Sequence, residues 1–145
     1  MVRVSRFKLP EETLNKLLDL FFEVVGKKNS KIAFNETVID LLSPIERLMV
    51  AKRIAIMYLI LKDIDHRTIC FVLKVSMATV SKYRIIMERS NGIVPTLRQM
   101  IKHDQMKLML EELYSLLFPP GKSGVDWKVA WERKRKIERL KQQGI

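Results

Sequence analysis

The chain has 145 residues, which is long enough for one domain with a hydrophobic core. Its apolar fraction of 48% excludes global disorder, and its single cysteine, Cys70, excludes an intrachain disulfide. Lysine and arginine outnumber aspartate and glutamate by 27 to 16, and the net charge of +11 favours a polyanionic partner, nucleic acid before membrane.

The first part of the chain predicts three helices. Residues 10–26 begin with proline and two acids, which suit a helical first turn, and then repeat apolar residues every three or four positions up to a glycine. A shorter helix is expected over about 34–42, with Asn35 as a candidate cap. Residues 43–61 begin with Ser-Pro-Ile-Glu, which is the pattern of a capping box. The apolar residues that follow occupy nearly every side of the expected helix, which predicts a buried central helix.

Residues 65–89 predict a helix-turn-helix, in which two short helices cross at a tight turn. The stretch ICFVLKVSMATVSKYR, residues 69–84, has apolar residues one turn apart, a break, and a second helix rich in hydroxyl groups and bases. Lys74 stands in the turn, where many such motifs have glycine, so the turn must tolerate a side chain. The residues expected to face the core are Ile69, Cys70, Leu73, Val75, Val80 and Tyr83.

The second helix of this motif, residues 77–89, is expected to read the major groove of DNA. Its lysine and arginine side chains can contact phosphates or guanine edges, and its hydroxyl groups can hydrogen-bond to either. Its small apolar groups can touch a thymine methyl group. Ser76 is also expected to cap the helix. The candidate DNA-binding residues of the motif are Arg67, Ser76, Met77, Ala78, Thr79, Ser81, Lys82 and Arg84. A helical hairpin with solvated charges is the alternative interpretation.

The remaining residues predict a turn, one long helix and a basic tail. Ser-Asn-Gly at 90–92 indicates a turn, and a long helix is expected from about 94 to 118, ended by Pro-Pro-Gly. Residues 122–145 carry eight bases and three acids. The apolar residues that would share one face of a tail helix are Trp127, Trp131, Ile137 and Leu140. The candidate phosphate contacts of the tail are Arg133, Lys134, Arg135 and Lys136. Docking of the tail on the body, with solvated charges, is equally open.

We therefore expect an all-α fold with two parts. Residues 1–121 should form a domain of about six helices that contains the helix-turn-helix, and residues 122–145 should form the basic C-terminal helical tail.

The run LLSPIERLMVAKRIAIMYLILKDIDHRTICFVLKVSMATVSK, residues 41–82, resembles the Trp-repressor-like superfamily of helix-turn-helix proteins. The shared features are the Leu-Leu-Ser-Pro start, an arginine at Arg53 in the helix after it, and Ala-Thr-Val-Ser-Lys in the recognition helix. A replication-initiator DNA-binding domain has a similar core, but the Leu-Leu-Ser-Pro start favours the Trp-repressor-like superfamily. The resemblance implies an intertwined homodimer, which holds two recognition helices about 34 Å apart on a palindromic site in double-stranded DNA.

The resemblance also raises the question of a tryptophan co-repressor. Superfamily members that bind tryptophan hold it with an arginine that matches Arg53 and with a second arginine in the recognition helix. Lys82 takes the second position here, and a lysine lacks the planar guanidinium that grips a carboxylate. We therefore expect no tryptophan binding and no cofactor, and Arg53 is the single candidate for a ligand contact.

Other classes of protein find little support in the sequence. His66 and His103 are too few and too far apart for a metal cluster, and no catalytic arrangement is present. The N-terminal residues show no signal peptide, and the most apolar stretch, 54–61, is far shorter than the roughly 20 residues of a membrane helix. We expect a cytoplasmic, nucleoid-associated transcriptional regulator that binds specific DNA and is not an enzyme. The alternative is a general architectural DNA- or RNA-binding protein that relies on the basic tail.

Overall fold

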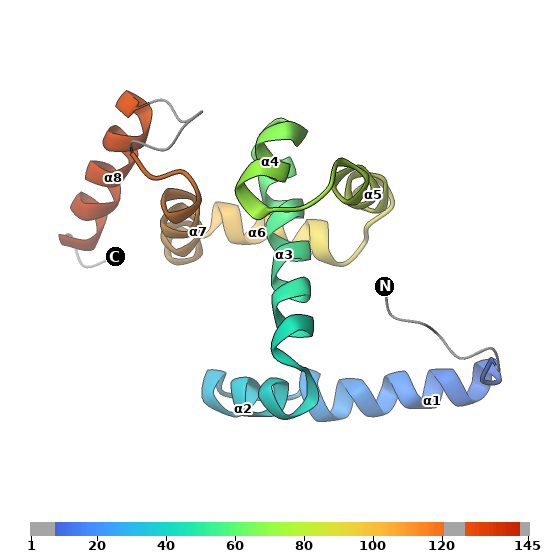
Figure 1. The fold of residues 1–145 in the computed structure, drawn as a ribbon. Helices are drawn as coiled ribbons and strands as arrows, with labels where there is room; N and C mark the ends of the chain where they lie inside the picture. The colour runs from blue at the N-terminus through green and yellow to red at the C-terminus, as the bar shows by residue number, and fades with distance from the viewer. Residues whose placement is uncertain (1–7, 121–126, 143–145) are drawn as a thin grey trace. The chain divides into compact units, whose positions relative to one another are not determined.

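A computed structural model describes residues 8–120 and 127–142, and every regular element in these ranges is helical (Figure 1). Eight α-helices and one short π-helix, η1, follow one another along this part of the chain. The prediction of an all-α fold is confirmed. The chain divides into two compact units, Met1–Val50 and Ala51–Ile145, which are described separately below. The boundary that we expected at residues 121 and 122 lies outside the described residues.

The first unit begins with α1 (Glu11–Phe21), which continues directly into η1 (Phe22–Gly26). Pro10 precedes the helix, and two glutamates occupy its first turn, so the predicted start is confirmed. The predicted end at Gly26 is also confirmed. A Cβ at this position would lie 2.7 Å from the ring of Phe22, which explains why a glycine closes the element.

The next helix, α2 (Lys31–Leu41), begins earlier than predicted. Ser30 is its cap, because the Ser30 Oγ accepts a hydrogen bond from the backbone N–H of Ala33 at 3.1 Å. Asn35, which we expected as the cap, lies inside the helix. The serine hydroxyl satisfies a free backbone N–H of the first turn, so Ser30 defines the start of α2.

No residue of α1, η1 or α2 is buried. Their large apolar side chains lie instead at the surface, with exposed fractions such as 47% for Leu17, 54% for Phe21 and 73% for Ile32. The stripe on α1, which we call the α1 stripe, consists of Leu14, Leu17, Leu18 and Phe21. Scattered apolar residues are normal on a protein surface, whereas a continuous apolar stripe is typical of an interaction surface.

Helix α3 (Pro44–Leu61) starts with the predicted capping box. The Ser43 backbone N–H donates to the Glu46 carboxylate at 2.9 Å, and the Glu46 N–H donates to the Ser43 Oγ at 3.3 Å. The Ser43 Oγ also donates to the Glu46 carboxylate at 2.8 Å, and the two hydrogen bonds that the carboxylate accepts, from the Ser43 N–H and hydroxyl, hold the pKa of the Glu46 carboxyl below its ordinary value. The helix is buried only in its second half, where Tyr58 and Leu59 are 1% and 0% exposed, whereas Ile45 is 71% exposed. The prediction of burial all along the helix was therefore wrong for the first half.

The second unit is built round the C-terminal half of α3. It contains α4 (His66–Leu73), α5 (Met77–Glu88), α6 (Ile93–Lys102), α7 (Asp104–Leu117) and α8 (Trp127–Gln142) (Figure 1). Its main cluster of buried side chains consists of Ile56, Tyr58, Leu59, Ile69, Leu73, Val80, Leu110 and Phe118. One core thus holds both helices of the predicted DNA-reading motif and α7.

The single long helix that we predicted over 94–118 is two helices. The backbone is extended at His103, with φ −86° and ψ 122°, so α6 ends at Lys102 and α7 begins at Asp104. The backbone carbonyl of His103 accepts the N–H of Lys107, which starts the new helix. The turn predicted before α6 is confirmed, because the Ser90 Oγ accepts the N–H of Val94 at 3.2 Å.

Tyr58 joins α3 to α7 inside this core. Its hydroxyl group donates to the backbone carbonyl of Leu110 at 3.3 Å, and its side chain is almost fully buried. Burial raises the pKa of the Tyr58 hydroxyl above its ordinary value, and the nearby carboxylate of Glu111 raises it further.

Replacing Tyr58 with phenylalanine is expected to lower the free energy of unfolding by about 0.5–1.5 kcal/mol at neutral pH, because the hydrogen bond from the Tyr58 hydroxyl to the Leu110 carbonyl is lost. A tyrosine in the unfolded chain ionises near pH 10, whereas the folded Tyr58 resists ionisation, so the wild type should lose stability as the pH rises above about 10. Urea unfolding at neutral pH and at about pH 11 tests this expectation. The variant should lose less stability than the wild type over that range, and an equal loss would contradict the argument.

Candidate nucleic-acid interface

Two capped helices form the predicted helix-turn-helix. Asp65 caps α4 by accepting the Thr68 N–H at 3.0 Å, and the hydrogen bonds from Thr68 lower the pKa of the Asp65 carboxyl. Ser76 caps α5 by accepting the Thr79 N–H at 3.2 Å, which confirms the predicted role of Ser76 as a cap. Because each cap satisfies a free backbone N–H, both helices have a defined first residue.

The turn between these helices has a left-handed residue at Lys74, with φ 54° and ψ 55°. A side chain there is strained, because Cβ crowds the backbone in this conformation. The Lys74 ammonium lies 4.3 Å from the ring centroid of Phe71, a cation–π contact that offsets part of the strain. The backbone N–H of Val75 donates to the Cys70 carbonyl at 3.2 Å and closes the turn.

The inward side of the motif follows the predicted pattern. Ile69 and Val80 are fully buried, and Leu73 is 7% exposed. The remaining three residues that were expected to face the core are partly buried against the same cluster, and these are Cys70, Val75 and Tyr83. Because a helix turns by about 100° per residue, burial of Val80 fixes which side chains of α5 face outward.

Most of the candidate DNA-binding side chains lie on the outward side. The exposed ones are Arg67, Ser76, Met77, Ala78, Ser81, Lys82 and Arg84, and Thr79 is half-buried. The Thr79 hydroxyl lies 2.8 Å from the Ser76 Oγ, so it belongs to the cap. An Arg84 guanidinium nitrogen lies 3.4 Å from a ring nitrogen of His66, and this contact joins α5 to the first turn of α4.

The outward face of α5 also carries an apolar residue that the sequence interpretation did not include. Ile85 is 63% exposed and follows Ser81 by one helical turn, so the two side chains share a face. Its spacing from Ser81 is the signal that would have identified it. Arg53, the candidate ligand contact, is exposed on α3, and no hydrogen bond or ion pair between described residues engages it.

The basic tail forms α8, and one side of α8 packs against α7. Ala130 and Ile137 are 4% and 7% exposed on that side. Trp131 and Leu140 are partly buried, and the side chain of Trp127 is outside the described residues. The apolar stripe that we expected therefore docks on the body, as far as it is described.

Of the four basic side chains in the tail that were candidates for DNA binding, one packs against α7 and three are exposed. Arg133 faces α7, where its Nε lies 3.4 Å from the Glu111 carboxylate and its guanidinium lies 3.7 Å from the ring centroid of Tyr114. Glu111 also accepts the Lys62 ammonium at 3.2 Å, so this carboxylate contacts one basic side chain directly after α3 and one in α8. The other three candidates are exposed, and these are Lys134, Arg135 and Lys136.

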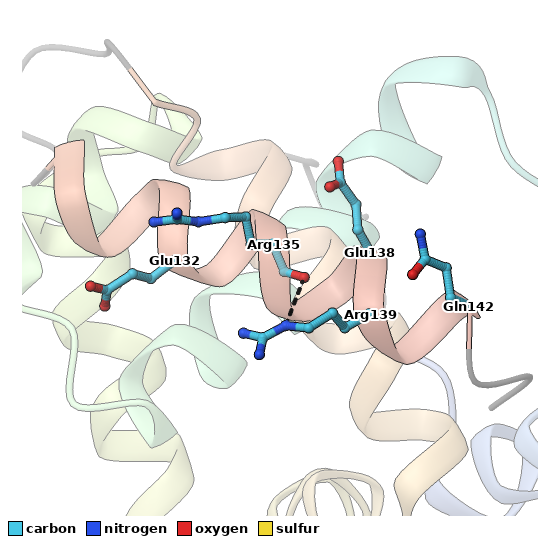
Figure 2. A pocket seen from close by; sticks show the side chains of 5 residues that line it. All are labelled: Glu132, Arg135, Glu138, Arg139 and Gln142. Carbon is cyan, nitrogen blue, oxygen red and sulfur yellow. Dashed lines mark hydrogen bonds between the residues drawn. The ribbon is translucent and has the colours of Figure 1, made fainter.

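A shallow hollow lies on the exposed side of α8. Figure 2 shows the five side chains that line it, which are Glu132, Arg135, Glu138, Arg139 and Gln142. The Arg139 Nε donates to the backbone carbonyl of Arg135 at 3.5 Å. All five residues belong to one helix, so the hollow is a feature of the helix surface.

Comparison of the chain with family models, with curated proteins and with solved structures finds no match. None of the helices within 8–120 and 127–142 combines the length and the apolar character that a membrane span requires. The same residues contain no group of three or more histidines, cysteines or acids that could hold a metal ion.

The strain in the turn can be measured with two substitutions at Lys74. Lys74→Gly and Lys74→Ala both remove the cation–π contact with Phe71, but only glycine adopts the left-handed conformation without a steric cost. The glycine variant is therefore expected to be more stable than the alanine variant by about 1 kcal/mol. Urea unfolding of both variants measures the difference. Equal stabilities would mean that the turn is not left-handed at this residue.

Proposed function

We propose that this protein is a sequence-specific regulator of transcription, which binds double-stranded DNA as a homodimer and reads the major groove with α5. The observation that carries the proposal is the outward face of α5, where hydroxyl, basic and small apolar side chains lie together on a helix that is capped and packed from behind. These are the chemical groups that hydrogen-bond to base edges and contact thymine methyl groups.

The exposed side chains of α5 have distinct roles in this proposal. Ala78 and Ser81 are short, so the helix backbone can approach the floor of the groove closely. Lys82 extends from the same face and can donate to guanine, while Met77 and Ile85 supply apolar contacts to thymine methyl groups. Arg67 in α4 serves as a phosphate contact that fixes the orientation of the motif.

Duplex DNA is favoured over RNA by the composition of this face. The major groove of B-DNA is about 12 Å wide and admits an α-helix, whereas the major groove of A-form RNA is too deep and narrow for side chains to read. Readers of single-stranded RNA stack bases on exposed aromatic rings. The aromatic residue of α5, Tyr83, packs against the core instead.

The homodimer is supported by the α1 stripe and by the absence of buried residues from α1, η1 and α2. A helix that exposes a continuous apolar face in the single chain gains stability when a second copy covers it. The resemblance of residues 41–82 to the Trp-repressor-like superfamily supports the same arrangement. Two copies of α5 would then meet two half-sites about 34 Å apart, so the DNA site should be a palindrome. A nucleoid location in the cytoplasm follows from this function.

The proposal is tested by replacing both Lys82 and Arg84 with alanine. Selection from random duplex DNA should yield an enriched palindromic motif for the wild type. The double variant should bind that motif more weakly, by about 1–3 kcal/mol for each base-reading side chain that the substitutions remove. Competition with unrelated duplex DNA should show that the preference itself is reduced.

The matched control is Lys28→Ala with Lys31→Ala, which removes the same charge from exposed residues of the first unit. This variant should keep the preference for the selected motif. Absence of any enriched motif for the wild type, or an unchanged preference in the Lys82 and Arg84 variant, would overturn the proposal.

The dimer has a separate test in the α1 stripe. Leu17→Glu places a carboxylate in the stripe, and its burial without a partner is expected to weaken association at least about tenfold. Asn15→Glu adds the same charge to α1 outside the stripe and should leave association unchanged. Sedimentation equilibrium measures the mass of each variant. A wild type that sediments as a monomer at all concentrations would exclude the dimer.

A further inference from the structure

Because α8 packs against α7, its basic side chains fall into two groups, those that contact α7 and those that face away from it. Arg133 and Lys141 lie against α7, where Arg133 pairs with Glu111 and the Lys141 ammonium lies 2.6 Å from the Glu112 carboxylate. With Ala130 buried on the same side, α8 is held by apolar burial and by ion pairs together. The basic side chains on the opposite side of α8 therefore point away from α7.

That opposite side, which we call the outer face of α8, is centred on two arginines. Arg135 and Arg139 are four residues apart, so they lie one above the other on the helix, and both are exposed. Figure 2 shows them beside Glu132 and Glu138 in the hollow of the helix surface. No ion pair between described residues engages either arginine, so both guanidinium groups are open to an external anion. Lys136 is exposed next to them.

We propose that the outer face of α8 binds the phosphate backbone of DNA, outside the groove that α5 reads, and supplies affinity that does not depend on sequence. This inference rests on the proposed DNA-binding function. Long, always charged guanidinium groups suit phosphate oxygens, and contacts of this kind position a protein on the duplex without reading bases. The phosphate contacts are Arg135, Lys136 and Arg139.

An anionic membrane would offer phosphate groups as well, but the distribution of apolar residues on α8 is unsuitable for it. A helix that lies on a membrane turns a broad apolar face toward the acyl chains. The apolar residues Ala130 and Ile137 are buried against the body instead, and the outer face presents charged and amide side chains. The charge pattern without an apolar face favours a hydrophilic polyanion.

This assignment differs from the sequence interpretation of the tail, which treated Arg133 as equivalent to the three bases that follow it. The Arg133 guanidinium stacks on the Tyr114 ring and pairs with Glu111, so it is a positioning residue that holds α8 in place. Lys134 is also left out of the phosphate contacts, because its ammonium lies 5.1 Å from the ring centroid of Trp131, and Arg139 joins Arg135 and Lys136 instead.

The test uses the full chain with Arg135→Gln and Arg139→Gln, together with random-sequence duplex DNA over a range of salt concentrations. Each phosphate contact contributes about 0.9 to the slope of log K against log salt, so the slope should fall in magnitude by about 2. The ratio of affinities for selected and random duplexes should not change. Lys28→Gln with Lys31→Gln is the control of equal charge, and its slope should match the wild type.

Each outcome has a definite meaning. An unchanged slope in the Arg135 and Arg139 variant would overturn the proposal, and so would an equal fall in the control, because net charge alone would then explain the effect. Reduced binding to phosphatidylserine vesicles with unchanged DNA binding would overturn it in favour of a membrane. If the wild type shows no sequence preference but the slope falls as expected, reading by α5 is wrong and the role of α8 stands. If the wild type shows a sequence preference but the slope is unchanged in the variant, reading by α5 stands and the role of α8 is wrong.

Discussion

The burial of Val80 in one cluster with Ile69 and Leu73 is the constraint on which the rest of the helix-turn-helix depends. A valine on α5 that is fully buried against α4 can occupy its position in only one rotation of the helix. Since successive residues are about 100° apart, a rotation by a single residue would bring polar side chains such as Ser81 toward the core. The caps at Asp65 and Ser76 fix the helix starts, and the left-handed turn between them fixes the crossing.

The Glu111 carboxylate on α7 links several elements of the second unit in a similar way. The side chain of Glu111 is only 13% exposed and contacts both Lys62 and Arg133. A nearly buried carboxylate is stable when opposite charges compensate for the loss of water, and here they come from elements far apart in the chain. Because Tyr58 packs beside it, the same region of α7 connects the end of α3 with the C-terminal helix.

The features that sequence could predict are those set by neighbouring residues. The caps at Ser43 and Ser76 and the apolar spacing of α4 and α5 depend on residues within one or two helical turns. The break at His103 could not be predicted in the same way, because no proline or glycine stands near it in the sequence. The ion pair of Arg133 with Glu111 could not be predicted either, because the two residues lie in different helices.

The uncovered apolar surface of the first unit has a consequence for how the chain folds. A segment without buried residues gains little free energy from burying apolar groups within itself. In the dimer that we propose, folding of α1 and α2 and association of the two copies would be a single equilibrium. The fraction of chains in which these helices are ordered would then rise with the concentration of the protein.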